Sequence, residues 1–211
     1  MIRVKGSIFR DFYKNMTPKT AKQKTEQPQR QRILKIAANL FAEHGYHAVG
    51  MTQLGDAVEL GRGTLYHYIK SKEDVLYEIS RQYISLLAQH GNDVLEREAD
   101  PKVRLQLLGE HLMNIMVTHQ AEVTVCFREM YSLTGPRRDA VLLLHREYEN
   151  VWRQVLIDGE EKGVFRPFNP VRLKGLLGMY FYSYIWMKPN SSQGPEAIAE
   201  VFNDIVLKGV A

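Results

Sequence analysis

The sequence predicts an all-α protein in which a small N-terminal domain is joined by a long helix to a larger helical C-terminal domain. Apolar residues recur at intervals of three and four residues along most of the chain, and glycines and prolines separate these runs. No segment of useful length alternates between apolar and polar residues as a half-buried strand would. A chain of 211 residues with 45% hydrophobic residues can bury a sizeable core.

Composition divides the chain into three parts. Residues 1–28 contain seven Lys or Arg residues and two prolines but few apolar residues in helical register, which predicts a flexible basic arm. The apolar pattern begins at residue 29, and residues 29–76 are expected to form the small domain. Residues 77–211 are expected to form the larger domain.

The small domain is predicted to hold three short helices, because its apolar residues fall into three groups with helical spacing. The first group stops at Gly45, a residue type that is common directly after a helix. The three predicted helices cover residues 29–44, 51–58 and 62–69. Ser71 then reads as an N-cap with Asp74 three residues later, and it predicts a long helix that reaches about Glu98 and links the domains.

The larger domain is predicted to contain further helices, each bounded by glycine or proline. Pro101 fits the first position of a helix, Gly135 and Pro136 end a second one, and Gly163 ends a third. The predicted helices cover residues 101–119, 123–133, 137–163, 171–187 and 195–208.

Basic residues are concentrated at the N-terminal end. Residues 1–75 carry 13 Lys and Arg against 7 Asp and Glu, and residues 76–211 carry 15 against 17, so the net charges are +6 and −2. This asymmetry favours an N-terminal part that meets a polyanion, although a solvated basic tail would have the same composition.

The predicted helix at residues 62–69 has the two faces that a DNA-reading helix needs. Leu65 and Ile69 share one face, whereas Gly63, Thr64 and His67 lie on or near the opposite face. The apolar face can pack on the preceding helix while the small and polar residues reach base edges in the major groove. The segment is therefore a candidate recognition helix.

Three neighbouring side chains are candidates for contacts with the DNA backbone. Tyr66 and Tyr68 flank the reading face, where phenol hydroxyls can reach phosphate oxygens. Lys72 places a cation in the first turn of a helix, which is mildly unfavourable against the helix dipole but makes a strong phosphate site. The competing interpretation for each residue alone is a core aromatic or a solvated lysine.

Three stretches of the small domain carry an ordered set of motifs, and they are Ala37–Tyr46, Gly63–Ile69 and Ser71–Leu76. Together they resemble the signature of the tetracycline-repressor (TetR) family. The resemblance implies a homodimeric transcriptional regulator, usually a repressor, that reads double-stranded operator DNA, expected to be palindromic, with one helix-turn-helix per subunit. It also implies a C-terminal domain that dimerises and binds a small ligand. The DNA contacts are then expected from Met51, Thr52, Arg62, Gly63, Thr64, Tyr66, His67, Tyr68 and Lys72.

Three residues depart from the family pattern. Glu59 stands where the family commonly has glycine in the turn, Gly61 where Ser or Thr often caps the recognition helix, and Ile69 where Phe is frequent. The departures concern turn geometry and capping, and the expected cost is small because glycine itself can serve as an N-cap.

Residues 171–208 are expected to form the dimer interface. The predicted helix at 171–187 is apolar nearly all round, so it must be covered on two sides, and the helix at 195–208 is its natural companion. Paired across a twofold axis, these helices would form a four-helix bundle, which is how the family usually dimerises. The alternative is that both helices lie inside a monomer.

The middle helices carry soft and aromatic side chains that suit a mostly apolar ligand pocket. These candidate ligand residues are Met113, Met116, His119, Cys126, Phe127, Met130, Trp152, Phe181 and Trp186. For any one of them, ordinary core packing is the competing interpretation.

Two further stretches, Gly159–Pro167 and Trp186–Pro189, bear on the effector. They are similar to a TetR branch whose members regulate fatty-acid or sterol catabolism and respond to acyl-coenzyme A thioesters. This second resemblance implies an acyl chain in the apolar interior and a phosphate-rich coenzyme near basic residues, for which the candidates are Arg128, Arg146, Arg153 and Lys188. Another apolar effector, such as a drug, is the alternative.

Other classes of function find little support. The chain has no nucleophile elbow, no phosphate-cradling loop and no dinucleotide fingerprint, and its histidine pairs lack the carboxylates of a metal site, so we predict no enzyme, no cofactor and no metal. The single cysteine, Cys126, fits a reduced cytoplasmic protein, and no apolar run reaches the roughly 20 residues of a membrane span. A helical adaptor that binds only proteins is the main alternative, but it leaves Lys72 and the basic arm unexplained.

Overall fold

The computed structural model describes residues 21–187 and 194–211, and within these ranges all the regular structure is helical, as the sequence predicts. The elements are α2 (Ala21–His44), α3 (Met51–Ala57), α4 (Arg62–Tyr68), α5 (Lys72–Arg97), α6 (Pro101–Thr118), α7 (Gln120–Glu129), the 3-10 turn η1 (Met130–Ser132), α8 (Gly135–Glu161), α9 (Pro170–Tyr182), the 3-10 turn η2 (Ser183–Ile185) and α10 (Pro195–Val210). Most of the predicted arm, residues 1–20, and Lys188 lie outside the described residues.

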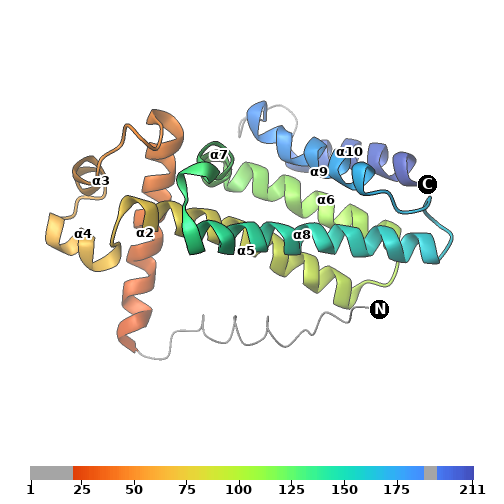
Figure 1. Cartoon of the computed structure of the whole chain (residues 1–211), viewed down its shortest axis with the longest axis horizontal. Coiled ribbons are helices and arrows are strands. Elements are labelled where there is room, and N and C mark those ends of the chain that lie inside the picture. The colour runs from red at the N-terminus through yellow and green to blue at the C-terminus, as the bar shows by residue number, and fades with distance from the viewer. Residues whose placement is uncertain (1–20, 188–193) are drawn as a thin grey trace.

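Helices α2, α3 and α4 form a small domain at one end of the molecule (Figure 1). Phe41 of α2, Leu54 of α3 and Leu65 of α4 meet in its core, where all three are buried. Val75 and Leu76 at the start of α5 belong to the same core. The small domain is therefore closed by the helix that continues into the larger one.

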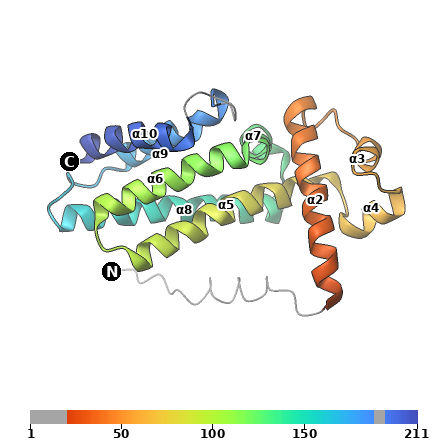
Figure 2. The same cartoon turned by 180° about the vertical axis from the view of Figure 1, so that it is seen from behind.

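Helix α5 links the two domains and begins at the predicted cap. The Ser71 hydroxyl accepts a hydrogen bond from the backbone N–H of Asp74 at 3.0 Å, which satisfies one of the free donors of the first turn. From there α5 runs beside α8 in both views of the molecule and packs along it (Figures 1 and 2). A displacement of α8 along α5 would therefore also displace the small domain.

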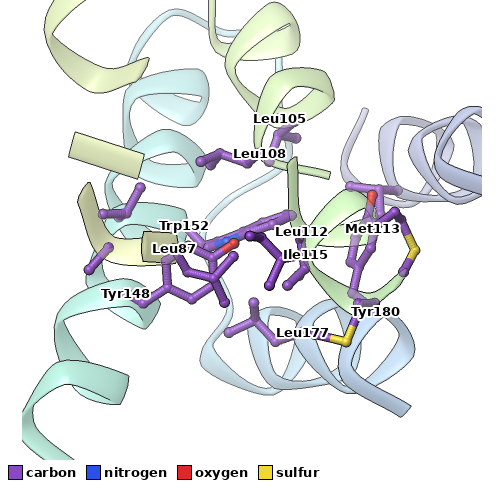
Figure 3. Packing of buried hydrophobic residues seen from close by; sticks show 14 of the residues in the cluster. Leu87, Leu105, Leu108, Leu112, Met113, Ile115, Tyr148, Trp152, Leu177 and Tyr180 are labelled. Carbon is purple, nitrogen blue, oxygen red and sulfur yellow. The ribbon is translucent and has the colours of Figure 1, made fainter. Parts of the chain in front are cut away.

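The larger domain packs α6, α8, α9 and α10 around the rest of α5 and α7. Its core combines leucines with large aromatic side chains, including Tyr148, Trp152 and Tyr180 (Figure 3). Gly109 lets α6 approach α10, because a Cβ at this position would collide with Asn203 Oδ1. That oxygen accepts a hydrogen bond of 2.7 Å from the Tyr180 hydroxyl, so the polar pair is satisfied inside the core.

The first helix differs from the prediction at its start. We expected it from Gln29, but α2 begins at Ala21 and contains Pro28. Residues 21–27 are mostly Ala, Lys and Gln, which are strong helix formers, so the helix continues before Pro28 although this proline removes one of its backbone hydrogen bonds.

The other clear difference lies before α8. We took Gly135 and Pro136 as the end of a helix, but they start α8, with Gly135 at a φ of 49° and Pro136 in the first turn. Proline fits a first turn because its missing N–H would have no partner there. In the part of the chain that the structure describes, no helix is long and apolar enough to cross a membrane.

Candidate DNA interface and effector site

The face of helix α4 that the sequence predicts for base contacts is exposed to solvent. Leu65 is buried, whereas Arg62, Gly63, Thr64 and His67 are exposed. The buried side holds α4 against the domain core, and the exposed side is small and polar. This is the division that a recognition helix requires.

The start of α3 lies beside α4. Met51 and Thr52 line a hollow of about 180 Å³ together with Arg62 and Tyr66. The Arg62 guanidinium lies 5.8 Å from the centroid of the Tyr66 ring, a cation–π distance. Tyr68 is only partly exposed and packs against the core of the small domain, so less of it is available to DNA.

The turn between α3 and α4 carries two of the departures from the family pattern. Glu59 adopts a left-handed φ of 58°, a region that favours glycine. Gly61 is the N-cap of α4 and offers no side-chain hydrogen bond to it. The turn keeps the helix-turn-helix shape, at the cost of local strain at Glu59 and a missing cap at Gly61.

Lys72 is bonded within the small domain. Its Nζ donates to the carbonyl oxygens of Tyr46 at 3.0 Å, Val49 at 3.1 Å and His47 at 3.4 Å. It also lies 4.5 Å from the centroid of the Tyr46 ring. An ammonium group has three donors, so these three carbonyl groups can occupy all of them. A direct phosphate contact by Lys72 would have to displace one of these bonds.

A polar joint connects the start of α5 to the start of α8. Arg137 pairs through Nη1 with Glu73 at 3.1 Å and through Nη2 with Asp74 at 3.2 Å. The backbone N–H and the hydroxyl of Thr134 donate to Glu73 Oε1 at 3.2 and 3.0 Å. Those hydrogen bonds, with a smaller contribution from Arg137, lower the pKa of Glu73. The first turn of α5, directly after α4, is thus held by the C-terminal domain.

A second set of contacts joins α7 and η1 to the small domain. His47 Nε2 lies 3.6 Å from Glu129 Oε2 and 3.2 Å from the Ser132 hydroxyl. Arg128 donates to the carbonyl oxygen of Ala42, in the last turn of α2, at 3.2 Å. The position of the helix-turn-helix therefore depends on α7 as well as on α8.

The predicted ligand residues fall into an inner and an outer group. Met113, Met116, Cys126 and Trp152 are fully buried in the core of the larger domain. Burial raises the pKa of the Cys126 thiol to about 12, so it stays neutral. These four side chains are brought together from α6, α7 and α8.

The outer group lies around α7 and η2. The Phe127 and Phe181 rings are 5.5 Å apart, and Met130 packs against the cores of both domains. His119 ends α6 with its Nδ1 3.6 Å from Glu122 Oε1. Trp186 is 47% exposed and its ring lies 6.1 Å from the Phe202 ring of α10, apart from the four inner residues.

A groove of about 630 Å³ lies between the small domain and the larger one. Its walls come from α2, from the α6–α7 junction and from η2, and include Lys35, Asn39, Gln120, Arg128 and Tyr184. Tyr184 stacks on Phe127 with ring centroids 5.0 Å apart, so the groove borders the aromatic residues that lead into the core. Glu43 and Glu122 also line it, which leaves the groove with charges of both signs.

The basic candidates for a coenzyme contact occupy different places. Arg128 lines the groove. Arg153 is bonded to Glu149 at 3.3 Å and lies 5.1 Å from the Phe168 ring centroid, away from the groove. Arg146 is exposed on α8.

Helices α9 and α10 leave an apolar face uncovered in the single chain. Val171 and Tyr182 of α9 are 77% and 62% exposed, and Val201 and Ile205 of α10 are 58% and 49% exposed. Exposed apolar side chains grouped on one surface are a feature of sites where proteins associate.

Sequence reasoning missed some residues that the structure brings to these sites. Lys35 and Asn39 of α2 were not among the predicted site residues, and they line the groove. Tyr83 and Tyr148 were expected as apolar core positions, but each buries a hydroxyl group. The sequence signal for Tyr83 and Tyr148 is a tyrosine hydroxyl at a position that the helical spacing predicts to be buried.

These features define a class of protein: a helix-turn-helix domain with an exposed recognition helix, coupled by ion pairs to a helical domain with an uncovered apolar face. Among the described residues, no group of three or more His, Cys, Asp or Glu side chains is arranged to hold a metal ion. The arrangement is that of a DNA-binding transcriptional regulator.

Comparison with known proteins identifies the family. Residues 33–79 match the model of bacterial regulatory proteins of the tetR family, and residues 98–210 match the tetracyclin repressor-like C-terminal domain. The chain belongs to the TetR family. It is therefore a DNA-binding regulator and not an enzyme.

Individual relatives match over most of the chain. The HTH-type transcriptional repressor KstR2 of Mycobacterium tuberculosis is 28% identical over 184 residues, which cover 86% of this chain and 92% of KstR2. The TetR family regulator PfmR from Thermus thermophilus is similar in structure, with a TM-score of 0.80 and 31% identity over 84% of this chain and 97% of PfmR. AibR, solved with isovaleryl coenzyme A and operator DNA, has a TM-score of 0.74 and 27% identity over 84% of this chain and 97% of AibR.

Proposed function

We propose that this regulator is a homodimeric repressor that a small acyl-coenzyme A or similar apolar effector releases from a palindromic operator. The observation that carries the proposal is the pair of joints by which α7 and α8 hold the helix-turn-helix, because α7 and α8 also enclose the candidate ligand residues. Anything that shifts α7 and α8 changes the position of α4. The related KstR2 is described as a repressor, which supports the direction of regulation.

The exposed face of α4 supplies the sequence-reading contacts in this proposal. Thr64 and His67 reach base edges, and Arg62 and Gly63 contact the bases or the groove wall. Met51, Thr52, Tyr66 and Tyr68 contact the DNA backbone or adjoining groups. Lys72 contributes to DNA binding indirectly, because its hydrogen bonds hold the segment that precedes α3. Replacing Thr64 or His67 should therefore change the preference among DNA sequences.

The dimer forms in this proposal through the uncovered face of α9 and α10, within residues 171–208. The exposed apolar side chains of both helices would be buried together in a four-helix bundle. The two recognition helices would then lie about 34 to 36 Å apart, or a little more, in successive major grooves. The effector favours another spacing, and the equilibrium shifts by the difference in its affinity for the two states.

The groove between the domains is the proposed entrance for the effector. Lys35 and Arg128 offer cations for the phosphates of the coenzyme, and Tyr184, Phe127 and Phe181 lead from the groove to the interior. The acyl chain would lie among the inner ligand residues. AibR, which resembles this chain in structure, was solved with an acyl-coenzyme A, which supports this effector class.

Fluorescence anisotropy tests the proposal directly. The protein is titrated onto DNA from upstream of its own gene and onto scrambled DNA at two salt concentrations, with and without a mixture of acyl-coenzyme A thioesters. We expect sequence-preferring binding that the thioesters release. Binding without release would refute the effector class, and equal binding to scrambled DNA across genomic fragments would refute sequence-specific regulation.

A pair of variants tests the entrance. Lys35→Gln should weaken release by the thioesters, whereas the matched variant Arg146→Gln, which removes an exposed cation on α8, should leave release unchanged. Equal loss in both variants would mean that the groove has no special part in binding the coenzyme.

A further inference from the structure

Four buried polar atoms of the larger domain lie between α5 and α8 with incomplete hydrogen bonding. They are Ser80 Oγ, Tyr83 OH, Tyr148 OH and Trp152 Nε1, and within the described residues none of them has a hydrogen bond of full geometry. Ser80 is near enough to the Cys126 thiol, and Trp152 to the Tyr148 hydroxyl, to lower their pKa by weak hydrogen bonds, whereas Tyr83 has no such partner. All four side chains are 2% exposed or less. Buried polar groups are almost always well paired, so an unpaired Tyr83 hydroxyl beside two weakly bonded pairs requires a reason.

The four atoms belong to one cluster. Tyr83 interacts with both Cys126 and Tyr148, and Ser80 lies beside Cys126. Tyr148 and Trp152 lie one turn apart on α8, and their ring centroids are 6.4 Å apart (Figure 3). His145, also on α8, is 6.2 Å from the Tyr83 ring and places its Nε2 3.9 Å from the Cys126 sulfur. We call these six residues the polar cluster.

The polar cluster carries no formal charge near neutral pH. Burial raises the pKa of Tyr83 and Tyr148 above the usual range of a phenol and lowers the pKa of His145 to about 4. No lysine, arginine, aspartate or glutamate contributes to the pKa of these groups or of Cys126. Among the described residues, the cluster therefore offers neutral hydrogen bonds, and no charged side chain is coupled to it that could balance an ion.

The groove between the domains reaches the polar cluster through aromatic side chains. Tyr184 in the groove wall stacks on Phe127, whose ring is 5.5 Å from Phe181. The Phe181 ring is in turn 6.2 Å from Tyr148. These packed rings form a continuous apolar path from the groove to the polar cluster.

We propose that the polar cluster receives a neutral oxygen group, such as a ketone, hydroxyl or ester carbonyl, at the inner end of the effector and rejects a carboxylate there. The inference rests on the effector function proposed above and adds the chemistry of the effector's buried end. Phenol, indole and hydroxyl donors bind a neutral acceptor at little cost, because they have lost their water already. An ionised carboxylate would be buried without a counter-charge, which is strongly unfavourable.

Three coenzyme A thioesters of equal chain length test the selectivity. One is decanoyl, the second carries a ketone next to the terminal methyl group, and the third ends in a carboxylate. We expect the ketone to release operator DNA at about a fivefold to tenfold lower concentration than decanoyl, the gain of one or two net hydrogen bonds, and the carboxylate to be weaker than both. Equal release by decanoyl and the ketone would overturn the inference while leaving the proposed function intact.

Probes without coenzyme A separate the two proposals if no thioester releases DNA. An alkyl methyl ketone and a fatty acid of the same length are compared by their effect on the melting temperature of the protein. A rise with the ketone and none with the acid would uphold the inference even though the proposed effector class had failed. No rise with either probe would overturn it.

Tyrosine variants provide the control. Tyr83→Phe removes an unpaired hydroxyl, so without ligand it should melt no lower than the wild type and should lose the preference for the ketone. Tyr180→Phe removes a hydroxyl that is bonded to Asn203, so it should melt lower and keep the preference. If both variants showed the same fall in melting temperature, the Tyr83 hydroxyl would be paired inside the free protein, as by buried water, and the inference would be wrong.

Discussion

Replacing Lys72 by methionine separates two explanations for a cation at the start of α5. The Nζ donates to three carbonyl oxygens of the segment that joins α2 to α3 and lies over the Tyr46 ring. Methionine keeps most of the length and the apolar stem of the side chain but removes these donors. If the structural contacts are the function of Lys72, the variant will lose stability and the salt dependence of DNA binding will stay the same.

The magnitude follows from the contacts. A hydrogen bond to a charged group contributes roughly 1.5–3 kcal/mol, but these carbonyl groups are partly exposed and water replaces much of the loss, so about 2 kcal/mol is expected for the set. For a chain of this size that corresponds to a fall in melting temperature of about 4–8 °C. DNA affinity should fall on all sequences alike, because the loop that positions α3 becomes less ordered.

The assay is DNA affinity measured at several salt concentrations, next to thermal melting. The slope of log affinity against log salt is negative, and a lost phosphate contact makes it less steep by about 0.9 per site, or about 1.8 for two sites in a dimer. We expect no such change for Lys72→Met. The matched variant Lys70→Met removes an exposed cation two residues earlier and should not lower the melting temperature. A reduced slope with unchanged stability in Lys72→Met would refute this reasoning and establish a direct phosphate contact.

Four further variants test other parts of the structure. Glu59→Gly should raise the melting temperature by about 1–2 °C, since relief of a left-handed φ outweighs the added backbone entropy by about 0.5 kcal/mol, and a decrease would show that the turn is unstrained. Arg137→Ala should reduce the ratio of DNA affinities without and with effector, measured by anisotropy, and an unchanged ratio would remove this joint from the coupling. Ile205→Asp should convert the dimer to a monomer in sedimentation, and a dimer that persists would place the interface elsewhere. The pKa of His145 falls to about 4 in the folded protein, so unfolding takes up a proton below about pH 6.5 and stability declines on acidification by about 2 kcal/mol at pH 5. His145→Phe should therefore lose less stability between pH 7 and pH 5 than the wild type, as measured by melting, and an equal loss would contradict the assignment.

The helices of the small domain were predictable because local signals mark their ends. Gly45 closes α2, Ser71 caps α5, and the spacing of Leu65 and Ile69 fixes which face of α4 is buried. The exposed reading face follows from that burial without knowledge of the rest of the fold. Local chemistry was sufficient here because each signal acts within one helical turn.

The glycines and prolines of the larger domain were harder to interpret. Gly135 and Pro136 fit the end of one helix and the start of another equally well, and only the packing of α8 against α5 decides between them. Gly159 belongs to a stretch that resembles one branch of the family, but its role here is steric, because a Cβ would collide with the Phe165 ring. That stretch therefore builds the turn between α8 and α9.

The proposed effector site was predictable only as a region. Periodicity identifies Tyr83 and Tyr148 as core positions, but it does not show that their hydroxyls lie near each other in the core. Trp186 was predicted as a ligand residue together with buried side chains, and the structure leaves it 47% exposed. Which polar atoms meet depends on contacts between helices that are far apart in the sequence, and no local pattern encodes those contacts.

The polar cluster and the two joints share the same helices, which gives the proposed regulation a physical route. Cys126 of α7 lies in the cluster, and two residues later Arg128 holds the last turn of α2. His145 of α8 also lies in the cluster, about two turns after Arg137, which holds the start of α5. An oxygen group inserted between α5, α7 and α8 must separate them, because the core there is closely packed. The small movement is carried along stiff helices to ion pairs and hydrogen bonds that weaken as their atoms separate, and the recognition helix is then free to leave its DNA-binding position.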